Sequence, residues 1–369
     1  MMGGDRSVMV AMSGGVDSSV AAGLLARQGF NVIGVTLLFS ACDDETVNWC
    51  CGTPAQVDAR AVAQKLGIPF YTVDCATEFE SRVLRPAWEE YARGRTPSPC
   101  VVCNRQIKFE MLLELGKKLG VNKMASGHYA RIVRDKKTDR PLLYRGKDPA
   151  KDQSYFLYSL SEEQLGNMIF PLGELEKTEV REIAREMGFA NAERKESQDA
   201  CFVYSEGSFA EGLRVRFDAP ASSGLVVDNA GNRLGEHGGI HNYTIGQRKG
   251  LGIAVGHRAY VTHIDPHRSQ VVLSDAVEDL EARYLWATET VWTSGRPAEL
   301  PVRCQVQIRY RHRPVDAVIE WERAGRVKIR FDTPQRAVAP GQAAVVYLGS
   351  QVLGGGWIEK GGNEANSDA

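Results

Sequence analysis

The sequence predicts an α/β N-terminal domain with a parallel sheet, followed by two all-β modules. Two patterns in the sequence predict this architecture. Over roughly the first 125 residues, short apolar runs typical of buried strands alternate with stretches whose apolar residues recur at helical spacing. From about residue 210 onward, Gly, Pro, Asn and Asp separate short alternating runs instead, which is typical of an all-β half.

The elements of the N-terminal half follow one another in strand–helix order. We predict strands at residues 7–12, 32–39, 69–73 and 123–126, and helices at residues 18–28, 54–66 and 108–119. Pro54 suits the first turn of its helix, and Gly29 and Gly120 suit the left-handed residue that ends one. Because parallel strands place their carboxyl ends at one edge of a sheet, a ligand is expected at that edge.

The C-terminal half contains short predicted strands, at residues 224–228, 259–264, 270–273, 303–308, 317–321, 327–331 and 343–347. A polar, helix-compatible stretch at residues 274–282 marks a break between two β modules. The predicted domains are therefore residues 1–210, 211–275 and 276–360. The polar residues 361–369 are predicted to be a disordered tail.

Composition narrows the class of protein. The chain has 369 residues, 43% hydrophobic and 25% charged, which excludes bulk disorder and a disulfide-stapled miniprotein. Its 45 Lys and Arg against 46 Asp and Glu give a net charge of −1, so nucleic-acid binding must depend on local patches. No run reaches the ~18 apolar residues that span a bilayer, and the N-terminus lacks the order of a signal peptide. We therefore expect a cytoplasmic protein with no membrane partner, whose eight cysteines are ligands, catalysts or core residues.

The first predicted turn is rich in small residues. Residues 12–19 read Met-Ser-Gly-Gly-Val-Asp-Ser-Ser, between a strand and a helix, where backbone N–H groups and the helix dipole favour an anion. No Gly-Lys-Ser/Thr of the lysine-containing P-loop follows. The pattern resembles the pyrophosphatase-type loop of enzymes that cleave ATP to AMP and pyrophosphate. On that interpretation Asp17 organises Mg²⁺ and Ser13 and Ser18 bond phosphate oxygens; the alternative is a tight turn capped by serines.

A second motif, residues 96–109, contains two prolines and a Cys-x-x-Cys pair. The prolines predict a rigid, extended approach to Cys100 and Cys103. Cys103 and Asn104 are predicted near the start of a helix, where a thiolate is stabilised. Alone, the spacing fits a redox dithiol, half of a zinc site or part of an iron–sulfur cluster. Cys201, about 100 residues further on, is a third candidate that only folding can bring close.

Other candidate ligands have plainer alternatives. Gly127 and His128 follow the predicted strand at residues 123–126, so Gly127 is expected against the nucleotide. His128 is a site residue, a structural histidine or, least favoured, a fourth metal ligand. The remaining cysteines are interpreted as packing groups, with a metal-binding loop as the alternative for the first three: Cys42, Cys50, Cys51, Cys75 and Cys304.

One local patch is basic. Residues 301–331 carry eight Lys or Arg and three acids, a net charge of +5. Tyr310 and His312 interleave with the arginines, which suits phosphate contacts combined with base or sugar packing. The alternative is a solvated β face with cross-strand charge pairs.

Together these motifs resemble the tRNA-specific 2-thiouridylases of the MnmA/TrmU family, from Val8 to Glu359. The combination is far more specific than any one of its marks, which are residues 13–19, 103–109, 127–129, 151–156, 173–177, 243–252, 309–311, 340–342 and 354–356.

The resemblance implies a PP-loop, HUP-like ATP-pyrophosphatase fold for residues 1–210 and a tRNA-binding β-barrel for residues 276–360. The implied reaction adenylates the C2 oxygen of the wobble uridine of tRNA and releases AMP when sulfur attacks, giving 2-thiouridine. The implied ATP-binding residues are Ala11, Met12, Ser13, Gly14, Gly15, Val16, Asp17, Ser18, Leu37 and Gly127. The implied tRNA-binding residues are Lys151, Asp152, Gln153, Arg309 and Tyr310, with Ser98, Pro99 and Cys100 beside the target base.

The same resemblance gives two routes for sulfur. Cys103 matches the family's nucleophile and Cys201 the cysteine that receives sulfur as a persulfide, a route that ends in a Cys103–Cys201 disulfide. Many members have an aspartate where this chain has Cys100. Members with Cys100, Cys103 and Cys201 resemble thiolases that hold a [4Fe–4S] cluster. We therefore favour a cluster on these three cysteines, fed by sulfide or a persulfide carrier, with the persulfide route as the alternative.

Two other classes of function share parts of this pattern. An amide-forming synthetase would use the same ATP loop but would need neither Cys103 nor Cys201. A non-catalytic RNA-binding protein would bind tRNA without consuming ATP, and the intact Asp17, Ser18 and three cysteines disfavour it.

Overall fold

The structure is a computed structural model of the 369-residue chain. It describes residues 6–39, 47–49, 53–194, 202–204, 207–293, 295, 297 and 299–363. The chain divides into two compact units. The first spans residues 1–83, 100–205 and 350–352, and the second spans residues 84–99, 206–349 and 353–369.

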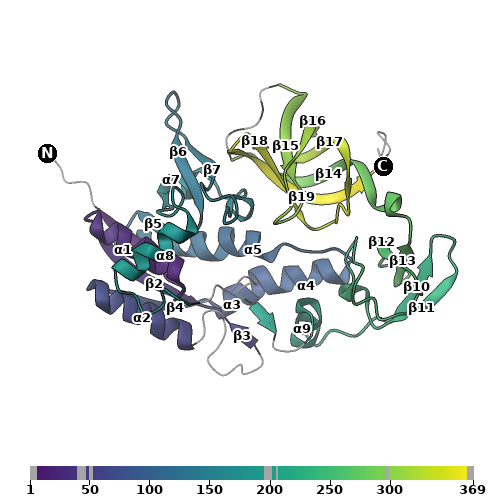
Figure 1. Cartoon of the computed structure of the whole chain (residues 1–369), viewed down its shortest axis with the longest axis horizontal. Helices are drawn as coiled ribbons and strands as arrows, with labels where there is room; N and C mark the ends of the chain where they lie inside the picture. Colours follow the sequence, from purple (N-terminus) through teal and green to yellow (C-terminus); the bar gives the residue numbers. More distant parts are fainter. Residues whose placement is uncertain are drawn as a thin grey trace. The chain divides into compact units, whose positions relative to one another are not determined.

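A five-stranded parallel sheet organises the first unit (Figure 1). Its strands, in spatial order, are β4 (Phe70–Asp74), β2 (Asn31–Leu38), β1 (Ser7–Ala11), β5 (Lys123–Ser126) and β8 (Met168–Ile169). Val8 and Val10 of β1 face one hydrophobic cluster, and Met9 is fully buried on the other face. A strand buried on both faces is apolar throughout, which is why these strands stand out in the sequence.

Helices cover both faces of this sheet. Helices α1 (Val16–Arg27), α2 (Thr53–Leu66) and α8 (Lys177–Glu186) contribute to the cluster on one face, together with Ala125 of β5. Helix α6 (Glu110–Leu119) packs on the other face, where Gly116 lies against Met124. The predicted doubly covered parallel sheet is confirmed.

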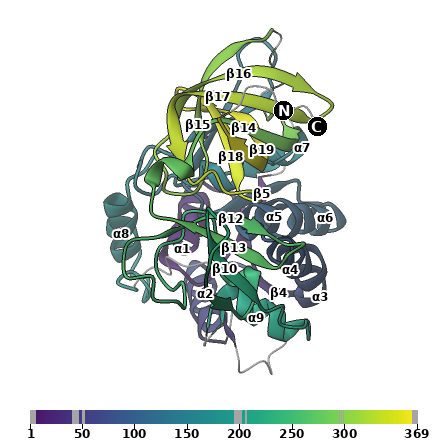
Figure 2. The same cartoon turned by 90° about the vertical axis from the view of Figure 1, so that its right-hand side faces the viewer.

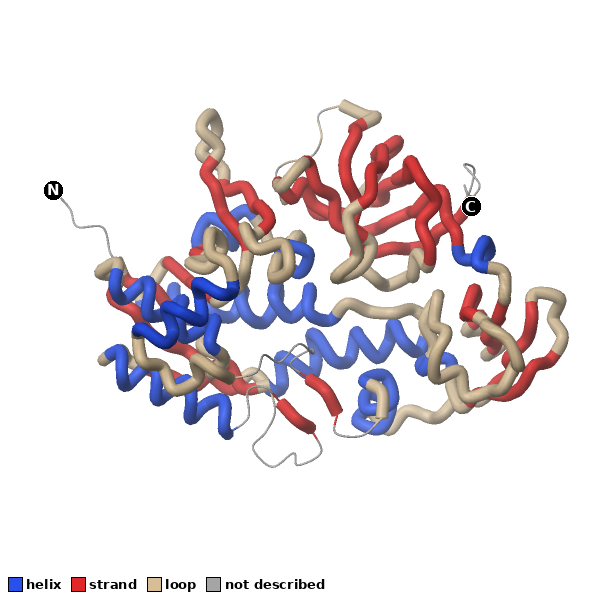
Figure 3. The backbone as a smooth tube through the Cα atoms, viewed as in Figure 1, coloured by secondary structure: helices blue, strands red, loops and turns tan. Residues whose placement is uncertain are grey.

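Two helical runs contain a π-helical turn. The first joins α3 (Ala76–Phe79), the π-turn Glu80–Leu84 and α4 (Arg85–Ala92); the second joins α5 (Pro99–Val102), the π-turn Cys103–Phe109 and α6 (Figure 3). The sequence analysis predicted a helix at residues 108–119, and its predicted start was wrong. Pro99 is compatible with the first turn of a helix, so the run begins there and Cys103 is its fifth residue.

The first unit also contains elements that the sequence analysis missed. They include the antiparallel hairpin β6 (Ala130–Arg134) and β7 (Pro141–Arg145), the 3₁₀ turn Ser154–Phe156, helix α7 (Glu162–Asn167), and β3 (Val47–Trp49) paired with β9 (Phe202–Tyr204). Helix α7 begins with a capping box in which Ser161 and Gln164 bond each other's backbone N–H.

The second unit contains a four-stranded sheet in the order β11 (Arg233–His237), β10 (Gly224–Asp228), β13 (Gln270–Ser274) and β12 (Tyr260–Asp265). Its core includes Val226, Val261 and Val271. Helices α4 and α9 (Phe209–Arg216) lie beside the 3₁₀ turn Ile240–Asn242, and Trp88 contacts His241 edge to face.

Six antiparallel strands of the second unit close into a barrel (Figure 2). Their order is β14 (Glu281–Val291), β17 (Arg326–Arg336), β16 (Val315–Arg323), β15 (Val302–Gln307), β18 (Ala343–Leu348) and β19 (Gln351–Gly362), and β19 pairs with β14. Closure removes the exposed sheet edges. The predicted β-barrel is confirmed.

Two sequence predictions near the barrel need correction. The stretch at residues 274–282 contains only a 3₁₀ turn, Val277–Leu280, before β14 begins at Glu281. The predicted tail is ordered at its start, because Gly361 and Gly362 extend β19 and pair with Leu285 and Tyr284. The rest of that prediction, residues 364–369, lies outside the described residues. None of the described helices is long and apolar enough to cross a membrane.

Candidate functional site

The small-residue loop lies between β1 and α1, at the carboxyl edge of the parallel sheet. Its first residue is fixed to β2, because the Met12 N–H donates to Val35 O at 2.8 Å and Thr36 Oγ1 donates to Met12 O at 2.6 Å. Gly14 has φ +76°, and a Cβ there would lie 2.2 Å from Ala55 O of α2. Only glycine fits this turn.

The loop leaves backbone N–H groups open at the start of α1. Gly15 is the N-cap residue and no side chain caps the helix. The N–H groups of Gly15, Val16 and Asp17 have no acceptor among the described residues. Together with the positive end of the helix dipole, they form the kind of site that binds phosphate.

The serine hydroxyls of the loop maintain its shape. Ser18 Oγ accepts from the Ser13 N–H at 3.1 Å and donates to Gly15 O at 3.1 Å, and Ser19 Oγ donates to the same carbonyl at 3.0 Å. The serine-capped turn and the anion site therefore coexist, since the hydroxyls hold the turn while the N–H groups remain open.

Asn191, after α8, is a supporting residue that the sequence analysis missed. Its Nδ2 donates to Gly14 O and to Ser19 Oγ, each at 2.9 Å. The side chain is buried, and its Oδ1 has no partner among the described residues. This amide therefore ties α8's far end to the loop.

Asp17 is the centre of a small polar cluster. Its Oδ1 accepts from the Tyr129 hydroxyl at 2.8 Å and from Lys177 Nζ at 2.6 Å. Its Oδ2 has no hydrogen bond to the part of the chain that the structure describes. Lys177 is nearly buried and lies in the first turn of α8, where the helix dipole disfavours a cation, so Asp17 compensates its charge. Both partners lie in segments that the sequence analysis cited without giving them a role.

Leu37 and Gly127 border the loop on either side. Leu37 is near the end of β2 and Gly127 directly follows β5, and both strands are neighbours of β1. A Cβ on Gly127 would lie 2.7 Å from Asp17 C and from Ser18 N. The structure thus brings together the predicted ATP-binding residues, from Ala11 to Ser18 with Leu37 and Gly127, at one sheet edge.

The His128 side chain is half-buried among aromatic rings. Its Nδ1 is 2.7 Å from Ser126 Oγ, and its ring lies 5.6 Å from Phe109 and 6.0 Å from Phe170 between centroids. Burial lowers the His128 pKa well below 6.5, and the nearby Lys108 charge lowers it further. This environment matches the structural-histidine alternative.

Cys100 and Cys103 lie three residues apart in one helical run, so their side chains share a face. Cys100 is half-buried and Cys103 is 2% exposed. Asn104 donates through Nδ2 to Phe156 O at 3.3 Å, and its buried Oδ1 has no partner among the described residues. Two thiols on one face suit two ligands of a single metal centre.

The third cysteine of the predicted constellation, Cys201, lies outside the described residues, as do Cys42, Cys50 and Cys51. Among the residues that the structure does describe, no three His, Cys, Asp or Glu side chains gather as a metal site would require. Cys75 and Cys304 are buried, and burial raises the pKa of each thiol to about 12. Their interpretation as core residues is confirmed.

The segment before Cys100 is held by the second unit's own residues. Gln342 Nε2 donates to Thr96 O at 3.1 Å and to Pro97 O at 3.0 Å, and the Thr96 N–H donates to Pro340 O at 2.8 Å. The Pro-Gly-Gln mark at residues 340–342 thus braces the backbone that leads to Ser98 and Pro99.

Asp152 shapes the segment that is predicted to touch tRNA. Its carboxylate is 8% exposed and accepts four hydrogen bonds, from Gly146 N, Ser154 N, Ser154 Oγ and Arg145 Nη1, at 2.9–3.1 Å. Gln153 bonds the backbone of Tyr129 twice, through Oε1 and its own N–H, each at 3.0 Å. The segment is therefore joined to Asp17 through Tyr129.

The basic window divides into two parts. Cross-strand acids pair four of its eight cations: Arg303 with Asp332, Lys328 and Arg330 with Glu320, and Arg326 with Glu359. For these the charge-pair alternative holds. Arg309 and Arg313, after β15, make no ion pair with a carboxylate in the described part of the chain. Tyr310 lies between them, with the Arg311 guanidinium 5.7 Å from its ring centroid.

Comparisons with known proteins cover nearly the whole chain. Family models match residues 6–205 (tRNA methyl transferase HUP domain), 216–275 (tRNA methyl transferase PRC-barrel domain) and 282–358 (aminomethyltransferase beta-barrel domain). The tRNA-specific 2-thiouridylase MnmA of Geobacter metallireducens is 45% identical, over 96% of this chain and 97% of its own length. Those of Moorella thermoacetica and Clostridioides difficile are 45% and 44% identical, over 95% and 96% of this chain and 99% of theirs. Identity of this extent, on a fold that presents an open phosphate loop, shows that the chain belongs to the tRNA-specific 2-thiouridylase family of enzymes.

Proposed function

We propose that the enzyme thiolates the wobble uridine of tRNA in two steps that consume one ATP. In the first, the uridine C2 oxygen attacks the α-phosphate of ATP, an O–P bond forms and pyrophosphate leaves. In the second, sulfur attacks C2, the C–O bond breaks and AMP leaves with the oxygen, giving 2-thiouridine. The first step is needed because the oxygen of an amide-like carbonyl is a poor leaving group until it is phosphorylated.

The open N–H groups of residues 15–17 are the observation that carries this proposal. They support binding of ATP phosphates at residues 11–18, with Leu37 and Gly127 beside the adenosine. The unbonded Oδ2 of Asp17 fits a ligand of Mg²⁺, an ion that supplies charge neutralisation to the phosphates when bound. The chemistry is assigned to the domain at residues 1–210.

Lys177 is proposed as the cation of this loop, which has no lysine of its own. Its ammonium lies 2.6 Å from Asp17 Oδ1. The backbone N–H of Asp17 is itself one of the open N–H groups. Phosphate oxygens offer the ammonium a further anionic partner when ATP binds. The Tyr129 hydroxyl then keeps Asp17 in place, because it bonds the same Oδ1.

The tRNA is proposed to contact both halves of the chain. Lys151, Asp152 and Gln153 supply one contact, in which the Asp152 carboxylate holds the loop shape. Arg309 and Tyr310, in the barrel domain at residues 276–360, supply another, supported by the absence of a carboxylate partner for Arg309 among the described residues. Ser98, Pro99 and Cys100 are assigned to the target base.

For sulfur delivery we favour Cys100, Cys103 and Cys201 as the three ligands of a [4Fe–4S] cluster. Such a cluster, when bound, supplies a site that presents sulfide to the activated carbon without a redox change. The shared face of Cys100 and Cys103 supports this assignment. In the alternative, Cys201 carries a persulfide whose outer sulfur is transferred, and Cys103 closes a disulfide with Cys201.

The reaction is tested with the purified chain, unmodified tRNA, ATP and sulfide. We expect AMP and 2-thiouridine in equal amounts, measured by nucleoside mass spectrometry and nucleotide chromatography. Cys103→Ala should abolish thiolation, whereas Cys304→Ala, which removes another buried thiol, should retain it. ATP turnover without 2-thiouridine would refute the proposal and favour an amide-forming synthetase. Full thiolation by Cys103→Ala would refute the role assigned to Cys103.

The sulfur route is tested by iron and acid-labile sulfide content after anaerobic purification. About four irons and four sulfides per chain, lost in Cys100→Ala, would match a cubane cluster. A chain that binds no iron after reconstitution yet thiolates tRNA would refute the cluster and leave the persulfide route.

A further inference from the structure

The long loop of the central sheet is strongly cationic. Residues 244–258, between the 3₁₀ turn at Ile240–Asn242 and β12, contain no Asp or Glu. They contain four exposed basic side chains: Arg248, Lys249, His257 and Arg258. The proposed reaction leaves this loop without a role, although residues 243–252 are among the marks of the family.

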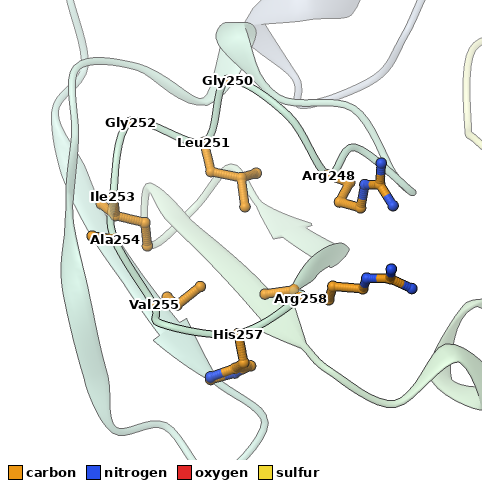
Figure 4. Close-up of a pocket in the computed structure, with 10 residues that line it drawn as sticks. Arg248, Gly250, Leu251, Gly252, Ile253, Ala254, Val255, His257 and Arg258 are labelled. Atoms are coloured by element: carbon orange, nitrogen blue, oxygen red, sulfur yellow. The ribbon is translucent and has the colours of Figure 1, made fainter.

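The loop lines an open hollow of about 730 Å³. Figure 4 shows Arg248 and Arg258 extending to the same side of it, from opposite ends of the loop. Leu251 and Val255 point into the hollow between them. Two guanidinium groups beside an apolar floor suit a phosphate whose attached sugar packs on the aliphatic side chains.

Hydrogen bonds hold the backbone of this loop in place, so the basic side chains extend from an ordered segment. Gln247 accepts from the Thr244 N–H at 3.0 Å and donates to Lys249 O at 3.1 Å. The Gly246 N–H donates to Val261 O at 2.7 Å, and the buried Tyr243 hydroxyl donates to Leu251 O at 2.8 Å. Bracing lowers the entropy lost when a ligand binds.

The cations of the loop also lack internal partners. The side chains of Arg248, Lys249 and Arg258 make no hydrogen bond or ion pair with any residue in the described ranges. Other arginines of the same unit are paired: Arg214 with Glu211 at 2.7 Å, Arg233 with Glu236 at 2.7 Å and Arg268 with Asp265 at 3.8 Å. Unpaired, exposed cations that gather on one loop are typical of a surface for an external polyanion.

We propose that Arg248, Lys249 and Arg258 bind the sugar–phosphate backbone of tRNA at this hollow. The inference rests on the proposed function, since it takes tRNA as the substrate, and it adds a contact that neither the barrel nor residues 151–153 supply. Backbone contacts carry no sequence information, so the loop sets affinity and orientation rather than the choice of base.

The test compares two double variants of the full chain. Arg248→Ala/Arg258→Ala removes the unpaired guanidinium groups. Arg233→Ala/Arg268→Ala removes the same charge from paired positions, in β11 and in the turn between β12 and β13. Binding of unmodified tRNA is measured by fluorescence anisotropy at several NaCl concentrations, and thermal unfolding verifies that both variants are folded. Sodium phosphate at matched ionic strength is a parallel arm, which distinguishes a polynucleotide site from one for free phosphate.

The proposal predicts that the Arg248/Arg258 variant loses about 10- to 100-fold in tRNA affinity near 0.1 M salt, and that the slope of log K against log salt becomes shallower by about two. The Arg233/Arg268 variant should lose far less. Equal losses in the two variants, or phosphate that displaces tRNA from the wild type more than chloride does, would overturn this inference alone. A folded wild type that binds no tRNA would overturn the proposed function as well.

Discussion

Replacing Gly127 with alanine tests the proposed ATP site at the carboxyl edge of the parallel sheet. Gly127 lies directly against the loop between β1 and α1. The added Cβ would be 2.7 Å from Asp17 C and from Ser18 N, and 3.0 Å from Asp17 O. All three are backbone atoms, and ordinary contacts of a Cβ begin at 3.4 Å. The loop and the end of β5 must therefore separate by a large fraction of an ångström.

The loop is poorly able to yield. Ser18 and Ser19 both bond Gly15 O, and Asn191 holds Gly14 O. We expect Gly127→Ala to lower the free energy of unfolding by about 1–3 kcal/mol, the usual effect of overpacking. Such a shift of the loop should slow adenylation by roughly 10- to 100-fold, because a misplacement of about 1 Å between reacting atoms can cost about 100-fold in rate.

The assay is tRNA-dependent pyrophosphate release, with ATP affinity from calorimetry and stability from urea unfolding. The matched control is Gly166→Ala in α7, where the nearest atom to the added Cβ is Pro141 Cγ at 3.9 Å. That change should be neutral or stabilise the protein by up to about 1 kcal/mol through helix propensity. A Gly127→Ala enzyme that releases pyrophosphate at the wild-type rate would refute the proposed position of the nucleotide.

Three further predictions concern single side chains, two in the first unit and one in the second. Lys177→Met should weaken ATP binding by roughly 10- to 100-fold, the effect of losing a charge-assisted hydrogen bond, and unchanged calorimetric affinity would exclude the ammonium from the phosphate site. The free energy of unfolding of the wild type should fall as pH drops below about 6.5, because the unfolded His128 imidazole then binds a proton that the folded one, with its lowered pKa, does not. His128→Asn should flatten this part of the pH dependence, measured by urea unfolding. An unaltered slope in the variant would contradict this prediction. Gln342→Leu should cost about 1–3 kcal/mol in the unfolding of the second unit, because Thr96 O and Pro97 O lose their shared donor, while ATP affinity measured in parallel stays at the wild-type value.

The sequence predicted what depends on local pattern. The strands at residues 123–126 and 224–228 have the predicted bounds, because short apolar runs are delimited by turn residues. The loop at residues 12–19 was recognisable because its glycines and serines are contiguous. The start of the helical run at Pro99 was missed because the π-turn at Cys103–Phe109 disrupts the helical spacing from which the helix was predicted.

Contacts between segments far apart in the chain could not be predicted from the sequence. Lys177 meets Asp17 across 160 residues and Asn191 meets Gly14 across 177, and neither carries a local signal of its partner. Asp152 matched a tRNA-binding segment, but its sequence context does not reveal a carboxylate already filled by four donors. The roles of Cys100, Cys103 and Cys201 stay predictions, because Cys201 lies outside the described residues.

The hydrogen bonds from Gln153 to Tyr129 and from Tyr129 to Asp17 have a thermodynamic consequence. A polynucleotide that shifts Gln153 also shifts the backbone of Tyr129 and, with it, the hydroxyl that restrains Asp17. Any free energy by which bound ATP then aids or opposes the polynucleotide must equal that by which the polynucleotide aids or opposes ATP. The coupling free energy between the two ligands is thus a reciprocal property, and it can be carried by three hydrogen bonds.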